Sequence, residues 1–265
     1  AGALGTLSAL YNWGYTVGGA LGSPLAGYLL DRWDYRTFGS VFAALALGVI
    51  AANLFALPRL ASHPSAKGAA SWRSLFGYGT IAAQRPVMRL SLLGFLPTFF
   101  WGMAVVLIPL LLQAASASKT AIAIYATVSQ VLAALAQIVT GRLADAGGPG
   151  DALRRATLIV LGTLVVAILG IAAWPGRLYG LFVFGTLSTA AAWSLSTLLP
   201  LWVAYATPSQ ERGRVLGWIH LWWNAAMVVG GMTGGALFER WPSLPFAIAG
   251  ALNLGTIGLA IVFFQ

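Results

Sequence analysis

The chain has no cysteine among its 265 residues and very few charged side chains. The lack of cysteine excludes a disulfide framework and a thiolate metal site. Charged residues make up 8% of the chain, whereas a soluble domain usually carries about 25%. Hydrophobic residues make up 59%, so the few charges cannot cover a surface that faces water. The composition therefore favours a protein that lies in lipid.

The charged residues are separated by long uncharged runs. These runs cover residues 1–30, 37–58, 90–118, 120–141, 156–176, 178–210, 215–238 and 241–265. A bilayer core about 30 Å thick is crossed by roughly 20 apolar residues in a helix, and every run is at least that long. Barrel strands are short and alternate polar with apolar residues, and these runs do neither. The sequence predicts an all-α polytopic membrane protein with about eight transmembrane helices.

The 15 basic residues outnumber the 6 acidic ones and are unevenly shared between the loops. When the loops are assigned alternately to the two sides of the membrane, one side receives twice as many basic residues as the other. The positive-inside rule places that richer side, which includes the 59–89, 142–155 and 211–214 segments, in the cytoplasm. Both termini of this chain are then expected to be cytoplasmic, in the cell (plasma or inner) membrane. The net charge of +9 thus reflects topology, and no nucleic-acid partner is expected.

The beginning and the end of the chain share a pattern. Seven residues within 4–22 recur within 216–234 at a constant offset of 212, and an acidic-Arg-Trp triplet follows each copy, at 31–33 and at 239–241. The first two spans therefore match the last two. If the last six spans form one unit, the opening pair is the end of an earlier six-helix unit, and four spans are expected to be missing before it.

Three local motifs accompany the repeat. They are Gly141-Arg142-Leu143-Ala144-Asp145 with Arg154 and Arg155 after it, the series Gly14, Gly18, Gly22, Pro24 and Gly27, and Glu211-Arg212-Gly213-Arg214. With the long basic central loop, the chain resembles the major facilitator superfamily of secondary transporters, in particular helices five to twelve of its twelve-helix fold. The extra residues between Asp145 and Arg154 depart from the family's pattern.

The resemblance implies a division of the chain. Residues 1–57 correspond to the last two helices of the N-terminal half, residues 58–87 to the cytoplasmic central linker, and residues 88–265 to the C-terminal six-helix half. It also implies a protein that is not an enzyme and holds no cofactor.

The motifs have two interpretations each. Small residues let helices approach closely, so Gly14, Gly18, Gly22, Pro24, Gly230 and Gly234 are interpreted as helix-packing positions. The alternative is that these seams bend or slide while the two halves rock. A conformational switch, in which the charges form a cluster, is the interpretation of Gly141, Arg142, Asp145, Arg154 and Arg155. The alternative there is an ordinary solvated loop.

No Asp, Glu, Lys or Arg falls deep inside a span, so a transport site must use neutral polar and aromatic groups. His220, Asn224 and Met227 are spaced to share one face of a helix, and Ser8, Asn12 and Tyr15 are their equivalents in the repeat. The candidates for a substrate cavity are Asn12, Tyr15, Trp101, Tyr125, Trp193, Thr197, His220, Asn224 and Met227. The alternative is that each asparagine bonds a neighbouring helix. No metal site is expected.

These features predict a secondary active transporter that moves a small organic molecule by alternating access. The expected partners are membrane lipid, the substrate, and a proton or other coupling ion whose gradient drives transport, with export as the candidate direction (efflux). A second hypothesis is a non-transporting, truncated or structural membrane protein. An intramembrane enzyme is a third, but Asp31 and Asp34 are the only close acidic pair and lie in a short charged turn.

Overall fold

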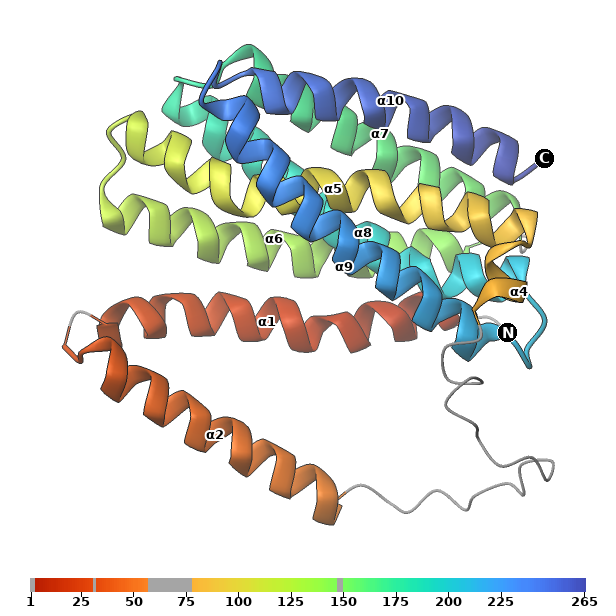
Figure 1. Cartoon of the computed structure of the whole chain (residues 1–265), viewed down its shortest axis with the longest axis horizontal. Coiled ribbons are helices and arrows are strands. Elements are labelled where there is room, and N and C mark those ends of the chain that lie inside the picture. The colour runs from red at the N-terminus through yellow and green to blue at the C-terminus, as the bar shows by residue number, and fades with distance from the viewer. Residues whose placement is uncertain (1–2, 31, 57–77, 147–149) are drawn as a thin grey trace. The chain divides into compact units, whose positions relative to one another are not determined.

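The computed structural model describes residues 3–30, 32–56, 78–146 and 150–265, and it contains no strand in these ranges. The helices are α1 (Leu4–Leu30), α2 (Tyr35–Ala56), the short α4 (Gly79–Ala82), α5 (Arg85–Ala114), α6 (Lys119–Asp145), α7 (Asp151–Ala173), α8 (Leu178–Ala206), α9 (Arg212–Phe238) and α10 (Leu244–Phe263) (Figure 1). Most of the predicted linker, residues 58–77, lies outside the described residues. The chain divides into two compact units, residues 1–21 with 78–265 and residues 22–77.

Six of the long helices, α2, α5, α6, α7, α8 and α10, are both long and apolar enough to cross a membrane. The other two, α1 and α9, have 27 residues each, which also suffices for a crossing. They are less apolar because glycine and polar residues interrupt them. The prediction of an all-α polytopic membrane protein is therefore confirmed, and the number of eight spans is approximate.

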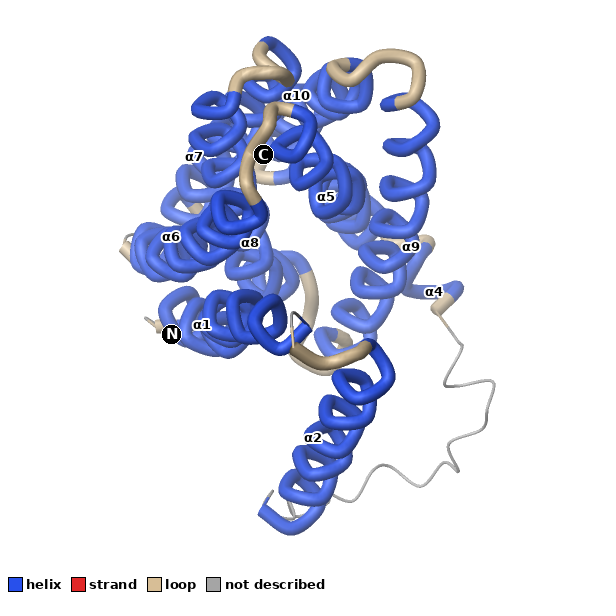
Figure 2. Tube along the Cα trace, turned by 90° about the vertical axis from the view of Figure 1, so that its left-hand side faces the viewer, coloured by secondary structure: helices blue, strands red, loops and turns tan. Residues whose placement is uncertain are grey.

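The first unit is a helix bundle with α8 near its middle. Helix α8 packs against α6 and α7 and also contacts α5, while α10 bridges α7 and α5, and α9 lies on α5 (Figure 2). Large apolar side chains such as Phe100 and Phe246 are fully buried between these helices, with their rings edge to face at 6.5 Å. Packing of this kind, with small residues where backbones approach, holds helices together in lipid.

Glycines let α5 and α9 approach until their backbones touch. A Cβ built on Gly102 would overlap the backbone of Met227, and one built on Gly230 would overlap the carbonyl of Phe99. At Gly234 a Cβ would lie 2.7 Å from the Met103 side chain. The predicted packing positions Gly230 and Gly234 therefore lie in a tight helix seam.

The α1 glycines behave differently. A Cβ on Gly14, Gly18 or Gly22 would meet no described atom within 4 Å, and Pro24 is exposed. In the part of the first unit that the structure describes, no helix packs against Gly14 or Gly18 as expected, because this part of α1 turns its other face to α6 and α8. Packing against a further helix stays a prediction for them.

The second unit contains the end of α1, a short turn and α2. The Asp34 carboxylate accepts a hydrogen bond of 2.8 Å from the backbone N–H of Thr37 and so caps the start of α2. Hydrogen bonding from Thr37 holds the pKa of Asp34 below its usual value. In the turn, the Arg32 guanidinium lies 3.7 Å from the centre of the Tyr28 ring.

A buried polar pair joins α7 and α8 in the first unit. The indole N–H of Trp202 donates to the Thr157 hydroxyl at 2.9 Å, and both side chains are almost fully buried. Thr157→Val keeps the shape of the side chain but leaves the indole N–H without an acceptor. We expect the free energy of unfolding to fall by about 1–2 kcal/mol.

The matched control is Thr163→Val, six residues further along α7, where the hydroxyl is exposed and bonds only its own helix. Chemical unfolding in detergent compares the two variants. Equal stability of both would show that the Trp202–Thr157 hydrogen bond does not stabilise the bundle.

Candidate functional site

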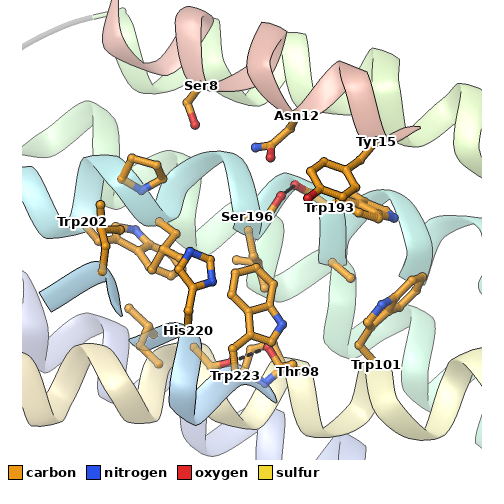
Figure 3. A pocket seen from close by; sticks show the side chains of 18 of the residues that line it. Ser8, Asn12, Tyr15, Thr98, Trp101, Trp193, Ser196, Trp202, His220 and Trp223 are labelled. Carbon is orange, nitrogen blue, oxygen red and sulfur yellow. Dashed lines mark hydrogen bonds between the residues drawn. The ribbon is translucent and has the colours of Figure 1, made fainter. Parts of the chain in front are cut away.

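A cavity of about 660 Å³ lies between α1, α5, α8 and α9 within the first unit (Figure 3). This volume falls in the range of about 300–1,000 Å³ that is usual for small-molecule sites. Among the described residues that line it there is no Asp, Glu, Lys or Arg. The walls consist of aromatic rings, neutral polar groups and a few aliphatic side chains.

The cavity brings together most of the residues that the sequence suggested. Those that line it are Asn12, Tyr15, Trp101, Trp193, His220, Asn224 and Met227. Ser8 lines it as well, so all three α1 positions that the repeat relates to His220, Asn224 and Met227 lie in the same cavity as their equivalents. Whether these residues bind a substrate stays a prediction.

Two of the candidates do not line the cavity. Tyr125 packs between α6 and α8, with its ring edge to face with Phe182 at 5.6 Å and its hydroxyl 2.7 Å from where a Cβ of Gly185 would be. The missing side chain at Gly185 leaves room for this ring. Thr197 is fully buried behind the cavity wall.

Hydrogen bonds to α8 and α6 position α1 beside the cavity. The Ser8 hydroxyl donates to the Thr197 carbonyl at 2.8 Å, and the Asn12 amide donates to the Thr197 hydroxyl at 3.4 Å. On the α6 side, the Trp13 indole donates to the carbonyl of Ala134 at 2.7 Å. Thr197 is thus an anchor for α1, and Asn12 serves as both a helix contact and a wall of the cavity.

Three aromatic rings gather at one end of the cavity. Tyr15 from α1 stacks on Trp193 from α8 at 6.1 Å, and Trp101 from α5 meets Trp193 edge to face at 6.4 Å. The Tyr15 side chain is 65% exposed, which leaves ring surface available to a ligand. We call Tyr15, Trp101 and Trp193 the aromatic end; Figure 3 shows it away from His220 and Ser8.

The α9 wall carries an imidazole that lies flat on an indole. The rings of His220 and Trp223 are 5.5 Å apart and within 3° of parallel. One turn further along, the Asn224 amide donates to the His220 backbone carbonyl at 2.8 Å.

Sequence reasoning missed two proline-containing parts of the wall. On α5, Gly94, Pro97 and Thr98 line the cavity, and on α8, Ser196 and Pro200 do so. Proline has no N–H for the carbonyl four residues earlier, so prolines inside long apolar runs mark places where a transmembrane helix carries free acceptors. That signal was present in the sequence.

Asp145, at the end of α6, bonds directly to the start of α1. Its carboxylate accepts hydrogen bonds from the backbone N–H groups of Gly5 and Thr6 at 2.9 and 2.8 Å and from the Thr6 hydroxyl at 2.8 Å. A negative charge at a helix N-terminus also interacts favourably with the helix dipole. We call this contact the Asp145 cap.

Two glycines make the Asp145 cap possible. A Cβ on Gly5 would lie 2.5 Å from the carbonyl oxygen of Gly141, and a Cβ on Gly141 would lie 2.5 Å from that of Gly5. Any side chain at either position would separate the helices and lengthen the hydrogen bonds to Asp145.

The expected charge cluster is not what the structure shows. Within residues 78–146 and 150–265, no ion pair joins Asp145 to Arg142, Arg154 or Arg155, because α1 already occupies the carboxylate. Arg154 and Arg155 instead line a shallow hollow with Asp151 at the start of α7. Asp145 therefore contacts a helix terminus and not a basic side chain of the motif, and the role of the motif as a conformational switch stays a prediction.

Comparisons with known proteins agree with this architecture. The family model described as Major Facilitator Superfamily matches residues 2–145 and, in a second match, residues 90–265. A comparison with curated proteins gave no match. The two family matches together span almost the whole chain, and members of this family are transporters. This chain therefore belongs to the major facilitator superfamily, as a membrane-spanning transporter of that type.

Proposed function

We propose that this transporter moves a small organic molecule by alternating access and binds it in the cavity between α1, α5, α8 and α9. The observation that supports the proposal best is the position of Asn12 and Asn224. These residues are equivalent in the internal repeat, yet both line one cavity. Transporters built from repeats commonly bind substrate at the interface between them.

In this proposal the Asp145 cap keeps one end of the cavity closed. It holds the start of α1 against α6 through charged hydrogen bonds that are made or lost as a set. Because α1 also forms a cavity wall, release of its end would widen the access to the cavity from that side. The basic 142–155 and 211–214 loops favour the cytoplasm for this end, and both termini lie on the same side in this proposal.

The wider organisation belongs to the same proposal. Residues 1–57 form the end of an N-terminal half, residues 58–87 the central linker and residues 88–265 the C-terminal half, in the cell membrane. A proton or other ion gradient drives transport, and export is the direction that we propose. In-frame coding sequence for four further apolar spans upstream of Ala1 would support this division.

Filling the cavity tests whether it is the substrate site. A panel of amphipathic compounds is first screened for those that raise the unfolding temperature of the purified chain. Asn224→Trp places a large ring in the cavity, so we expect the affinity for such a compound to fall at least about tenfold. The matched control is Val228→Trp, one turn along α9 and 62% exposed, outside the cavity lining.

Isothermal titration gives the affinities, and flux of the same compound in proteoliposomes gives the transport rate. Loss of affinity in Asn224→Trp but not in Val228→Trp supports the cavity as the binding site. Unchanged binding in both variants would place the substrate elsewhere. Binding without flux would favour a non-transporting protein.

A further inference from the structure

We propose that Tyr78, in the segment that the proposed division assigns to the central linker, is a positioning residue for the α9 wall of the cavity. Residues 78–84, which we call the strap, hold the start of α9 much as the Asp145 cap holds the start of α1. The strap includes α4 and lies beside the start of α9 in the first unit (Figure 1). The positioning is independent of any substrate, and only its effect on substrate binding rests on the proposed function.

The internal repeat relates two glycines that are each covered by a side chain from another part of the chain. Gly5 of α1 is equivalent to Gly217 of α9, at the offset of 212. A Cβ on Gly5 would lie 3.0 Å from the Oδ1 atom of Asp145, and a Cβ on Gly217 would lie 3.1 Å from the hydroxyl oxygen of Tyr78. Each glycine therefore leaves space for an oxygen atom of the side chain that covers it.

The residues after the two glycines contact the same covering side chains. Thr6 donates to Asp145 through its backbone N–H and its hydroxyl. Its equivalent, Trp218, packs its ring on that of Tyr78, with the ring centres 5.8 Å apart. The Trp218 indole N–H also donates to the Ser91 hydroxyl on α5 at 3.1 Å. The strap thus contacts the two positions of α9 that correspond to those the Asp145 cap contacts on α1.

The strap is anchored in the bundle. Ile81 in α4 is fully buried and belongs to the hydrophobic core. The backbone N–H of Ala82 donates to the Tyr78 carbonyl at 2.8 Å, which fixes the turn. Beyond α4, the Gln84 amide donates at 3.1 Å to the carboxylate of Glu211, the residue directly before α9. A hydrogen bond to a charged group is stronger than a neutral one, so the strap holds the start of α9 through both a ring contact and a charged hydrogen bond.

The part of α9 that the strap holds is a wall of the cavity. Leu216 directly precedes Gly217, His220 lies three residues after it, and both line the cavity. The Arg212 guanidinium joins the start of α9 to the end of α8 by donating to the Ala204 carbonyl at 3.1 Å. Loss of the Tyr78 ring would remove packing from one side of these first turns, so that the cavity wall could move away from α5.

The two ends that line the cavity are held by different parts of the chain. Asp145 belongs to α6, so the start of α1 is held from within the bundle. Tyr78 belongs to the segment that joins the two proposed halves, so a displacement of that segment would reach α9 and the cavity through Gly217. Local opening costs less free energy than global unfolding. We therefore expect release of the strap to open the cavity while the bundle stays folded.

A single introduced cysteine measures this opening, because the chain has no cysteine of its own. Leu199→Cys places a thiol on the α8 wall of the cavity, where the leucine is 4% exposed. In this background, Tyr78→Ala should accelerate the reaction of the thiol with N-ethylmaleimide about tenfold, because the ring contact with Trp218 is lost. Tyr78→Phe keeps the ring and should leave the rate near that of the parent.

Two controls separate positioning from a general loss of stability. Tyr179→Ala removes a ring that is 87% exposed at the start of α8, and it should not change the reaction rate at Leu199→Cys. Ala167→Cys places the thiol on α7, where the alanine is fully buried and does not line the cavity. The reaction rate at Ala167→Cys should not respond to Tyr78→Ala.

A second variant tests the strap without removing a ring. Gln84→Met deletes the hydrogen bond to Glu211 and should accelerate the reaction at Leu199→Cys about threefold. Gln113→Met is its control, because Gln113 is exposed near the far end of α5. Thermal unfolding in detergent shows whether each variant is folded.

An unchanged reaction rate at Leu199→Cys in both Tyr78→Ala and Gln84→Met, or an equal acceleration at Ala167→Cys, would overturn the inference and leave the proposed substrate site unaffected. Faster reaction together with weaker binding of the compound used with Asn224→Trp supports both proposals. Faster reaction with unchanged binding of that compound supports the positioning role of Tyr78 and counts against the cavity as the substrate site.

Discussion

Gly230→Leu is expected to lower the free energy of unfolding by about 3 kcal/mol, near the upper end of what overpacking costs in a well-packed interior. The first carbon of the new side chain would overlap the Phe99 carbonyl on α5. A backbone carbonyl cannot move aside without its helix, so α5 and α9 must separate along the seam that also contains Gly102. Since both helices line the cavity, ligand binding should fall as well.

Gly235→Leu is the matched control on the same helix. A Cβ there meets no described atom within 4 Å, and leucine has the better helix propensity, so stability should stay equal or rise slightly. Thermal unfolding in detergent measures both variants. If the two variants unfold at the same temperature, the close approach of α5 and α9 is not a determinant of stability.

Asp145→Asn is expected to release the start of α1. The charged hydrogen bonds from Gly5 and Thr6 become neutral ones, and one carboxylate oxygen is replaced by an NH2 group, a donor that faces at least one backbone N–H. Hydrogen bonds to a charged group contribute about 1.5–3 kcal/mol, so the exchange of these two amide hydrogens should accelerate by about 10-fold to 100-fold. Hydrogen–deuterium exchange followed by mass spectrometry of the α1 peptide measures this.

Asp151→Asn provides the comparison, because Asp151 is an exposed carboxylate in the first turn of α7. Asp151→Asn makes the same change of charge at the start of the neighbouring helix, but no hydrogen bond joins Asp151 to α1 among the described residues. Slow exchange at Gly5 and Thr6 in Asp145→Asn, as in the unchanged protein, would contradict the role of the Asp145 cap. Equally fast exchange in Asp151→Asn would point to a general effect of charge.

The candidate site shows where reasoning from sequence succeeds. His220, Asn224 and Met227 were expected on one face of a helix because a spacing of four and three residues brings side chains to the same side. The repeat then identified Ser8, Asn12 and Tyr15. The structure places all six in one cavity, since equivalent positions on α1 and α9 face a common space.

Other expectations depended on which helix lies next to which, and these were less successful. Thr197 was proposed for the cavity but anchors α1 from behind it, and Tyr125 fills the space left by Gly185. Asp145 was expected among arginines nearby in sequence, yet its partners, Gly5 and Thr6, are about 140 residues away. The α1 glycines looked like packing positions equivalent to Gly230 and Gly234, but no described helix covers them.

The physical reason lies in the environment of the helices. Membrane insertion depends on the length and apolarity of each run, so the membrane class and the helices follow from local sequence. Helical spacing decides which residues lie on the same face of a helix, so the α9 face follows from local sequence as well. Lipid is as apolar as the bundle interior, so the hydrophobic pattern does not mark which face of a helix is buried. The partners of Asp145, Thr197 and Gly230 were therefore decided by tertiary packing alone.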